Sequence, residues 1–277
     1  MSQPDTIKKL YKTFQEEVEK GKYKTGSIPA HPGSKIQRTK EDDEFLDENQ
    51  QKRYRSGVGM LLWLSKHTRP DATNAIRESS KVLDRASKEH YKYMLRIIKY
   101  IIKNRNKKLK IRINPDNLSG FELKGYSDSD YAGDLDTRRS VSGFSLFFNG
   151  ALIAWRSRGQ RSVSLSSTEA EFIALSEAIS EILFVRNIIV FLGGFINLPI
   201  QVFVDNMGAL YLAENNSSNS RIRHMEARNL FIREFVRDGV VEVVFVRSED
   251  NRADILTKNV SIILHDRHCE VYMHDDE

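Results

Sequence analysis

Apolar positions recur with a helical period in the first half of the chain and with a strand period in much of the second half. Pro70 fits the first turn of a helix, because its missing N–H would have no partner there. Residues 21–53 are polar and contain two prolines, which is typical of a linker or extended arm. The helices predicted in this half cover residues 1–20, 57–66, 71–85 and 88–103.

After Gly120 the pattern predicts strands joined by helices. Asn149-Gly150 lies between two apolar runs, and this dipeptide accepts the positive φ of a tight hairpin turn. The predicted strands cover residues 122–128, 142–148, 152–158, 200–205 and 240–246. The predicted helices cover 168–191, a short stretch ending near 214, 225–238 and 252–258. The order β-β-β-α-β-α-α-β-α indicates an α/β fold, a mixed sheet with one antiparallel hairpin and helical crossovers.

These patterns predict four regions along the chain. The first, 1–53, is an N-terminal helix with a polar linker, and the second, 54–120, is a basic helical module. The third, 121–260, is the α/β domain. The last, 261–277, is expected to be a disordered tail.

Charge is distributed unevenly. Residues 1–120 hold 27 Lys and Arg against 15 Asp and Glu, although the whole chain has a net charge of only +5. One stripe of the helix 88–103 is basic, and like charges at this spacing repel unless something anionic compensates them. We therefore expect contact with a phosphate backbone. The residues predicted to make it are Lys92, Arg96, Lys99 and Lys103, with Arg138 and Arg139 after the first strand.

Composition excludes several classes of protein. No apolar run approaches the roughly 20 residues of a membrane-spanning helix. The single cysteine, Cys269, excludes a disulfide framework and fits a reducing compartment. The first residues have no apolar signal segment, so we expect a cytoplasmic protein that is not secreted, with a nuclear location as an alternative.

Four carboxylates lie at the ends of predicted strands or at the starts of predicted helices. They are Asp128, Glu169, Asp205 and Asp254. Carboxyl ends of neighbouring strands meet at one edge of an α/β sheet, so these side chains are expected to converge. Four carboxylates in one cleft repel one another unless cations are present. Two Mg²⁺ ions would relieve that repulsion and clamp the attacking and leaving oxygens of a phosphoryl displacement.

Two of these positions have a competitor nearby. Asp130 lies on the same strand face as Asp128. Glu171 follows Glu169 by two residues, either can complete a helix-capping box, and apolar periodicity does not choose between them. Each carboxylate alone also fits a structural role, as a turn former or a cap. The coincidence of four favours a metal site.

Several ordered motifs resemble one family. The chain contains Tyr-Ser-Asp-Ser-Asp-Tyr-Ala-Gly-Asp (126–134), Arg-Arg-Ser-Val-Ser-Gly-Phe (138–144), Leu-Ser-Ser-Thr-Glu-Ala-Glu-Phe (165–172), Val-Asp-Asn (204–206), Arg-His-Met (223–225) and Ala-Asp-Ile-Leu-Thr-Lys (253–258). Together they resemble the ribonuclease H domain of copia-type retrotransposon polyproteins. Upstream, 54–64 and 68–71 resemble the segment that joins the reverse transcriptase of that family to its ribonuclease H, and 2–14 resembles the end of the polymerase.

The resemblance implies a ribonuclease H-like mixed five-stranded sheet with flanking helices, preceded by a small helical module. It implies an endonuclease that hydrolyses the RNA strand of an RNA–DNA hybrid with two Mg²⁺ ions, Mn²⁺ being the alternative, and leaves a 3′-hydroxyl and a 5′-phosphate. It assigns the metal ligands to Asp128, Glu169, Asp205 and Asp254, with Glu169 preferred to Glu171 and Asp128 to Asp130.

The sequence departs from the family in two ways. The loop 247–251 lacks the histidine that many ribonucleases H have before the last aspartate, while His224 matches a family position and is expected to contact nucleic acid. No Tyr-x-Asp-Asp motif of a polymerase palm is present, so we expect a fragment of a Pol polyprotein that acts with the remainder of the reverse transcriptase. A retrotransposon particle is a further alternative for its location. The alternatives are an inert nucleic-acid-binding relic and a connection subunit of a reverse transcriptase.

Overall fold

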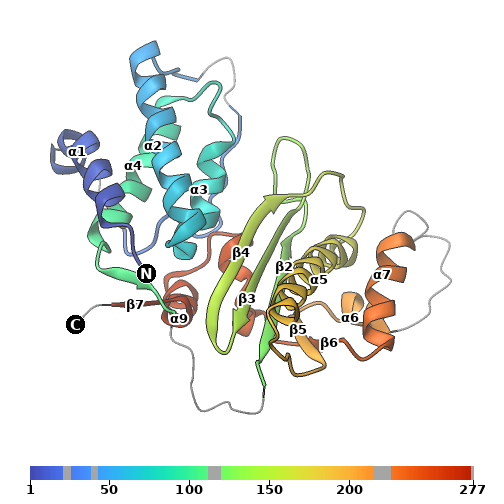
Figure 1. Cartoon of the computed structure of the whole chain (residues 1–277). Helices are drawn as coiled ribbons and strands as arrows, with labels where there is room; N and C mark the ends of the chain where they lie inside the picture. Colours follow the sequence, from blue (N-terminus) through green and yellow to red (C-terminus); the bar gives the residue numbers. More distant parts are fainter. Residues whose placement is uncertain (21–25, 39–42, 112–119, 215–225, 276–277) are drawn as a thin grey trace. The chain divides into compact units, whose positions relative to one another are not determined.

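The computed structural model divides into two compact units, and it describes residues 1–20, 26–38, 43–111, 120–214 and 226–275 (Figure 1). Unit 1 comprises Met1–Lys110, Asp134–Thr137 and Lys258–Glu277. Unit 2 comprises Ile111–Gly133 and Arg138–Thr257. Unit 1 is therefore assembled from three separate stretches of the chain. The sequence analysis instead divided the chain into four consecutive regions and did not group the first with the last.

Unit 1 is built from helices that bury a shared apolar core. Its elements are α1 (Pro4–Lys20), α2 (Glu48–His67), the 3₁₀ turn η1 (Pro70–Ala72), α3 (Thr73–Ser80), α4 (Lys88–Lys103), β1 (Lys107–Leu109), α9 (Ile262–Tyr272) and β7 (Met273–Asp275). Helix α2 begins earlier than the apolar period predicted, because Asp47 and Gln50 form a capping box that fixes its start. Helix α4 has the predicted bounds, and its buried stripe includes Met94 and Ile98.

The predicted linker packs into unit 1 where the structure describes it. Ile28 and Ile36 are buried. The Ile36 N–H donates to the Glu78 carboxylate at 2.7 Å, and the Gly33 N–H donates to the Asn259 carbonyl at 2.7 Å. The prediction of a linker was wrong for this stretch, because a few apolar residues and backbone hydrogen bonds hold an otherwise polar segment.

The predicted disordered tail is also wrong. Helix α9 buries His265, His268, Cys269 and Tyr272, and β7 pairs antiparallel with β1. These four positions recur at helical spacing and form one inward face. The face was missed because histidine and cysteine weaken its apolar signal in a window of only 11 residues.

A buried ion pair lies inside unit 1. Arg69 and Asp71 are 1% and 2% exposed, and their side chains make two hydrogen bonds of 2.9 and 2.7 Å. The Tyr100 hydroxyl donates to Asp71 at 2.7 Å. Burial raises the pKa of Asp71, but Arg69 and Tyr100 outweigh it and hold the pKa below its ordinary value. Asp71 is therefore ionised in the folded protein at neutral pH.

Unit 2 is a five-stranded mixed sheet with helices, as predicted. Its elements are β2 (Leu123–Asp130), β3 (Val141–Phe148), β4 (Ala151–Gly159), α5 (Ser167–Phe191), β5 (Ile200–Val204), α6 (Met207–Glu214), α7 (Glu226–Arg237), β6 (Val241–Phe245), the 3₁₀ turn η3 (Ser248–Asp250) and α8 (Asp254–Thr257). The strand order is β4-β3-β2-β5-β6, with β2, β3 and β4 antiparallel and β2, β5 and β6 parallel. The mixed sheet with a preceding helical module is confirmed.

The core of unit 2 lies where α5, α6 and α7 meet the sheet. Phe172, Leu175 and Ile179 of α5 join Val202 of β5 and Ile232 of α7 in one buried cluster. The β3–β4 hairpin turns at Asn149-Gly150, where both residues have positive φ, as the dipeptide predicted. Within the described residues, no helix is long and apolar enough to cross a membrane.

Candidate metal centre

Two neighbouring parallel strands carry the first two site residues. Asp128 lies near the end of β2, and Asp205 follows the last residue of β5. Because β2 and β5 are adjacent and parallel, their carboxyl ends meet at the same edge of the sheet. Asp128 is 1% exposed, and Asp205 is half-buried.

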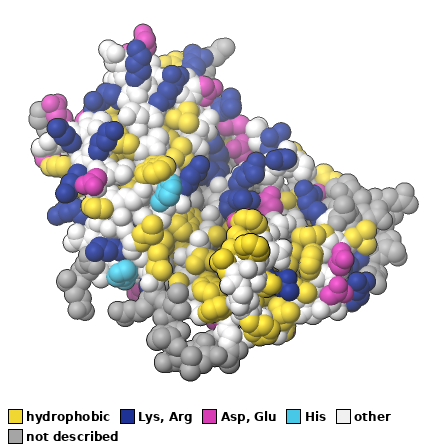
Figure 2. Space-filling model, viewed as in Figure 1, with side chains coloured by type: hydrophobic (Ala, Val, Ile, Leu, Met, Phe, Trp, Pro, Cys, Tyr) yellow, Lys and Arg dark blue, Asp and Glu magenta, His cyan; other side chains and the backbone are white. Residues whose placement is uncertain are grey.

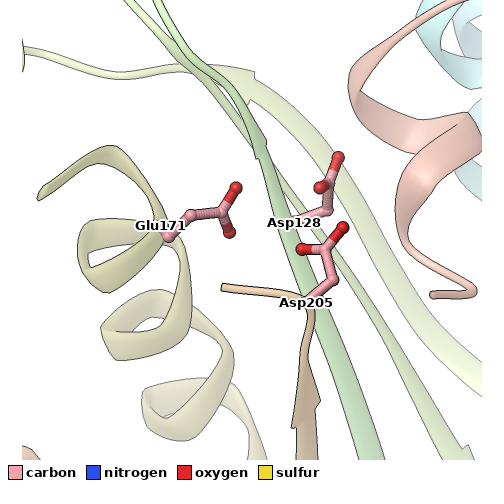
Figure 3. Close-up of side chains that lie close together, drawn as sticks. All are labelled: Asp128, Glu171 and Asp205. Carbon is pink, nitrogen blue, oxygen red and sulfur yellow. The ribbon is translucent and has the colours of Figure 1, made fainter. Parts of the chain in front are cut away.

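Helix α5 supplies the third carboxylate, Glu171. One carboxylate oxygen from each of Asp128, Glu171 and Asp205 lies within 4.8 Å of the other two. Figure 3 shows these side chains pointing toward one another from β2, α5 and the end of β5 (Figure 3). Oxygen atoms so close together are the ligand set that Mg²⁺ and Ca²⁺ prefer.

Glu171, rather than Glu169, occupies this cluster, which corrects the preference drawn from the family resemblance. Two residues along an α-helix rotate a side chain by about 200°, so the two glutamates point in different directions. Glu169 instead accepts a hydrogen bond from the Leu165 N–H at 2.7 Å. Asp130 and Asp254 are not members of the group of three either, within the described part of the chain.

Hydrogen bonds hold Glu171 by one oxygen. Its Oε1 accepts from the Ser129 N–H at 3.1 Å and from the Ser129 hydroxyl at 2.9 Å. Its Oε2 is buried and has no hydrogen-bond partner among the described residues. A buried carboxylate oxygen without a donor is costly, and a bound cation would supply the missing partner.

Helix α8 and the loop before it also contact β2 at the site. The Thr257 hydroxyl donates to Oδ2 of Asp128. Asp254 begins the same short helix and is 4% exposed, and the Thr257 hydroxyl also bonds its carbonyl at 3.0 Å. The Asn251 side chain, fully buried, donates to the Ser127 carbonyl at 2.9 Å and so fixes the loop before α8 against β2.

Sequence reasoning missed Ser129, Asn251 and Thr257 as supports of the site. Ser129 lies inside the Ser-Asp-Ser-Asp stretch at which the first strand was predicted to end. Its backbone N–H and hydroxyl both reach α5, a contact that depends on helix packing and leaves no local signal. Asn251 did leave a signal in the sequence, because an asparagine three residues before Asp254 is typical of the residues that cap the start of a helix.

Burial and the two neighbouring aspartates raise the pKa of Glu171 to about 9. Its ordinary value is 4.5, so the unfolded chain releases this proton at a lower pH than the folded chain does. Between about pH 4.5 and pH 9 the folded state retains a proton that the unfolded state loses. The metal-free protein should therefore lose stability as pH rises through that range.

Glu171→Gln should remove this pH dependence. We expect the metal-free variant to unfold at a higher temperature than the wild type at pH 8, by about 10 °C, and to match it near pH 5. Thermal unfolding in the presence of a chelator measures the difference, with Glu169→Gln as the matched control. A wild-type curve that is flat from pH 5 to pH 8 would contradict the raised pKa.

The predicted nucleic-acid contacts differ in exposure and in their partners within the structure. Lys99 is only 4% exposed, so its prediction as a phosphate contact is corrected. Lys92 pairs with Glu89 along α4, and Nη1 of Arg96 lies 2.8 Å from Nε2 of His31. The remaining predicted contacts stay predictions. Lys103, Arg138 and Arg139 are exposed, and His224 lies outside the described residues.

The chain is similar to Pol polyproteins of plant retrotransposons. It is 35% identical over 209 residues to the retrovirus-related Pol polyprotein from transposon TNT 1-94 of Nicotiana tabacum, a match covering 75% of this chain and 15% of that protein. It is 35% identical over 208 residues to the corresponding protein from transposon RE1 of Arabidopsis thaliana, covering 75% and 14%. The chain thus spans about a seventh of the length of these relatives.

A solved structure also matches part of the chain, while no protein-family model matches it. The crystal structure of LC11-RNase H1 in complex with an RNA/DNA hybrid is 15% identical, covers 51% of this chain and 97% of that chain, and has a TM-score of 0.35. The long match to the two plant proteins agrees with the motifs in the sequence, and the chain belongs to the family of copia-type, retrovirus-related Pol polyproteins, of which it represents a segment.

Proposed function

We propose that unit 2 hydrolyses the RNA strand of RNA–DNA hybrids, as the ribonuclease H part of a Pol polyprotein. The convergence of Asp128, Glu171 and Asp205 supports this proposal most strongly, because three separate elements bring these carboxylates to one sheet edge. Glu171 gives independent support, since its Oε2 is buried without a hydrogen-bond partner among the described residues.

The residues present fit divalent cations. Asp128, Glu171 and Asp205 would hold a cation. A second ion, with Asp254 as a ligand, is what the family resemblance implies. Mg²⁺, or Mn²⁺ in its place, lowers the pKa of water and neutralises the charge that develops on the reacting phosphate. In the hydrolysis, a water oxygen bonds to phosphorus and the bond from phosphorus to the 3′ oxygen breaks, which leaves a 3′-hydroxyl and a 5′-phosphate.

The protein contributes orientation. Ser129 holds Oε1 of Glu171 with two hydrogen bonds, while Oε2 has no hydrogen-bond partner among the described residues. The Thr257 hydroxyl holds one oxygen of Asp128. Ligands fixed in this way lose little freedom when a cation binds, and mutation of such supporting partners typically costs 10–100-fold in metal affinity or activity. Selectivity for RNA would come from contacts to 2′-hydroxyls in the minor groove of the hybrid.

The test incubates the whole chain with a labelled RNA–DNA hybrid and Mg²⁺, beside an Asp205→Asn variant of nearly the same shape. We expect the wild type to cut the RNA strand and the variant or a chelator to abolish cutting. Hybrid binding without cleavage by the wild type would instead identify an inert binding relic. Cleavage that begins only when a polymerase partner is added would identify a connection subunit.

A further inference from the structure

Large apolar side chains are exposed at the C-terminal end of α5 in unit 2. Phe184, Phe191 and Phe195 are 60%, 88% and 68% exposed. Ile188, Leu192 and Leu198 are exposed beside them, at 42%, 75% and 47%. We call these six residues the α5 patch. Figure 2 shows hydrophobic side chains gathered over this end of α5 (Figure 2).

The α5 patch is continuous because of how the helix ends. Phe184, Ile188 and Phe191 recur at spacings of four and three residues and share one helix face. Gly193, with φ of 81°, turns the chain back, and the Gly194 N–H donates to the Ile189 carbonyl at 2.9 Å. The following segment therefore runs beside the helix end and adds Phe195 to the same surface.

The exposed area is large for a single chain. At these exposures, and with about 150–250 Å² per phenylalanine, the α5 patch presents roughly 700 Å² of apolar surface. The largest apolar patch of a typical monomer covers about 300–600 Å². A stable protein interface buries about 800 Å² from each partner, which this patch and a narrow rim would supply.

The α5 patch is also free of charge. None of the six patch residues is charged, and the chain between Phe184 and Leu198 holds one charged residue, Arg186. A patch with charges of one sign would repel a copy of itself, whereas a neutral apolar patch is complementary to its own copy across a twofold axis. We propose that the α5 patch binds a second copy of this chain and forms a symmetric dimer.

This dimer leaves the metal centre accessible. Glu171 lies near the start of α5 and Phe191 at its end, so about 30 Å of helix separates them. The proposal is independent of the ribonuclease activity, because a monomeric variant should keep its hybrid cleavage. Failure of one proposal therefore does not imply failure of the other.

The experiment measures the mass of the whole chain in solution by sedimentation and light scattering, from about 1 to 100 μM, a range that covers the weak, micromolar end expected for interfaces of this size. We expect the mass to rise from 32.0 kDa toward twice that value with concentration. Phe191→Asp and, separately, Leu192→Asp should keep the protein monomeric at every concentration. Both side chains are mostly exposed, so neither change opens a cavity in the core.

Ile263→Asp is the matched control, because Ile263 is 77% exposed on α9 of unit 1. It should dimerise as the wild type does. A wild type that stays monomeric at every concentration would overturn the proposal, and would be expected if another part of the polyprotein covers the patch. Association without a defined size would overturn it as well, and so would dimers that persist in both patch variants. Circular dichroism of each variant establishes that it is folded.

Discussion

Glutamine in place of Glu171 is expected to lower the rate of Mg²⁺-dependent hybrid cleavage at least 100-fold. Removing only a residue that supports a metal ligand typically costs about 10–100-fold, and losing a ligand itself should cost at least as much. The amide keeps the size of the side chain but offers a neutral oxygen in place of a carboxylate. Glutamine therefore keeps the packing of α5 while weakening the cluster formed with Asp128 and Asp205.

The matched control is Glu169→Gln, two residues earlier on the same helix. Glu169 accepts a hydrogen bond from the Leu165 N–H, and a glutamine oxygen can accept that bond as well. We expect this variant to retain cleavage within a few-fold of the wild type. Single-turnover rates on a labelled hybrid, measured over a range of Mg²⁺ concentrations, compare the two. A larger loss in Glu169→Gln than in Glu171→Gln would reverse the assignment.

The second large effect is expected in unit 1, on stability. Asp71→Asn removes the charge that faces Arg69, whose side chain is 1% exposed. A buried guanidinium without its counter-ion typically costs about 3–5 kcal/mol. We therefore expect the free energy of unfolding of unit 1 to fall by about that amount, as measured by urea denaturation at neutral pH.

A double variant separates the charge from the packing. Arg69→Met combined with Asp71→Asn removes both charges and keeps an apolar side chain of similar length, so it should be clearly more stable than Asp71→Asn alone. Since the folded pKa of Asp71 is lowered, the contribution of the pair is present above its ordinary pKa and is lost as pH falls through the folded value. Equal stability of the single variant and the wild type would show that the pair contributes little.

Local patterns predicted the sheet of unit 2 well because its signals are short-range. Asn149-Gly150 fixed the hairpin, and the apolar run of residues 200–204 marked a covered strand. Asp128 and Asp205 could be placed together because both stand at carboxyl ends of strands, whose convergence follows from topology. The sequence therefore predicted that Asp128 and Asp205 meet at one sheet edge, where the structure brings their carboxylates close together.

The errors concern contacts that local patterns do not specify. The orientation of α5 decides between Glu169 and Glu171, and that orientation depends on packing against the sheet. Lys99 belongs to the same basic stripe of the sequence as Lys92 and Lys103, which are exposed, yet it is buried. The segments around Ile36 and Tyr272 read as a linker and a tail because their partners lie far away along the chain.

The three-part construction of unit 1 affects how the chain folds during synthesis. Helices α1 to α4 precede unit 2, whereas α9 and β7 are made after it. Helix α9 buries Cys269 and Tyr272, and β7 pairs with β1. At about 5–20 residues per second, a ribosome needs roughly 10–30 s to travel from β1 to β7. Unit 2 is fully translated within that interval. Unit 2 is therefore expected to reach its native state ahead of unit 1, although helices α1 to α4 of unit 1 emerge first.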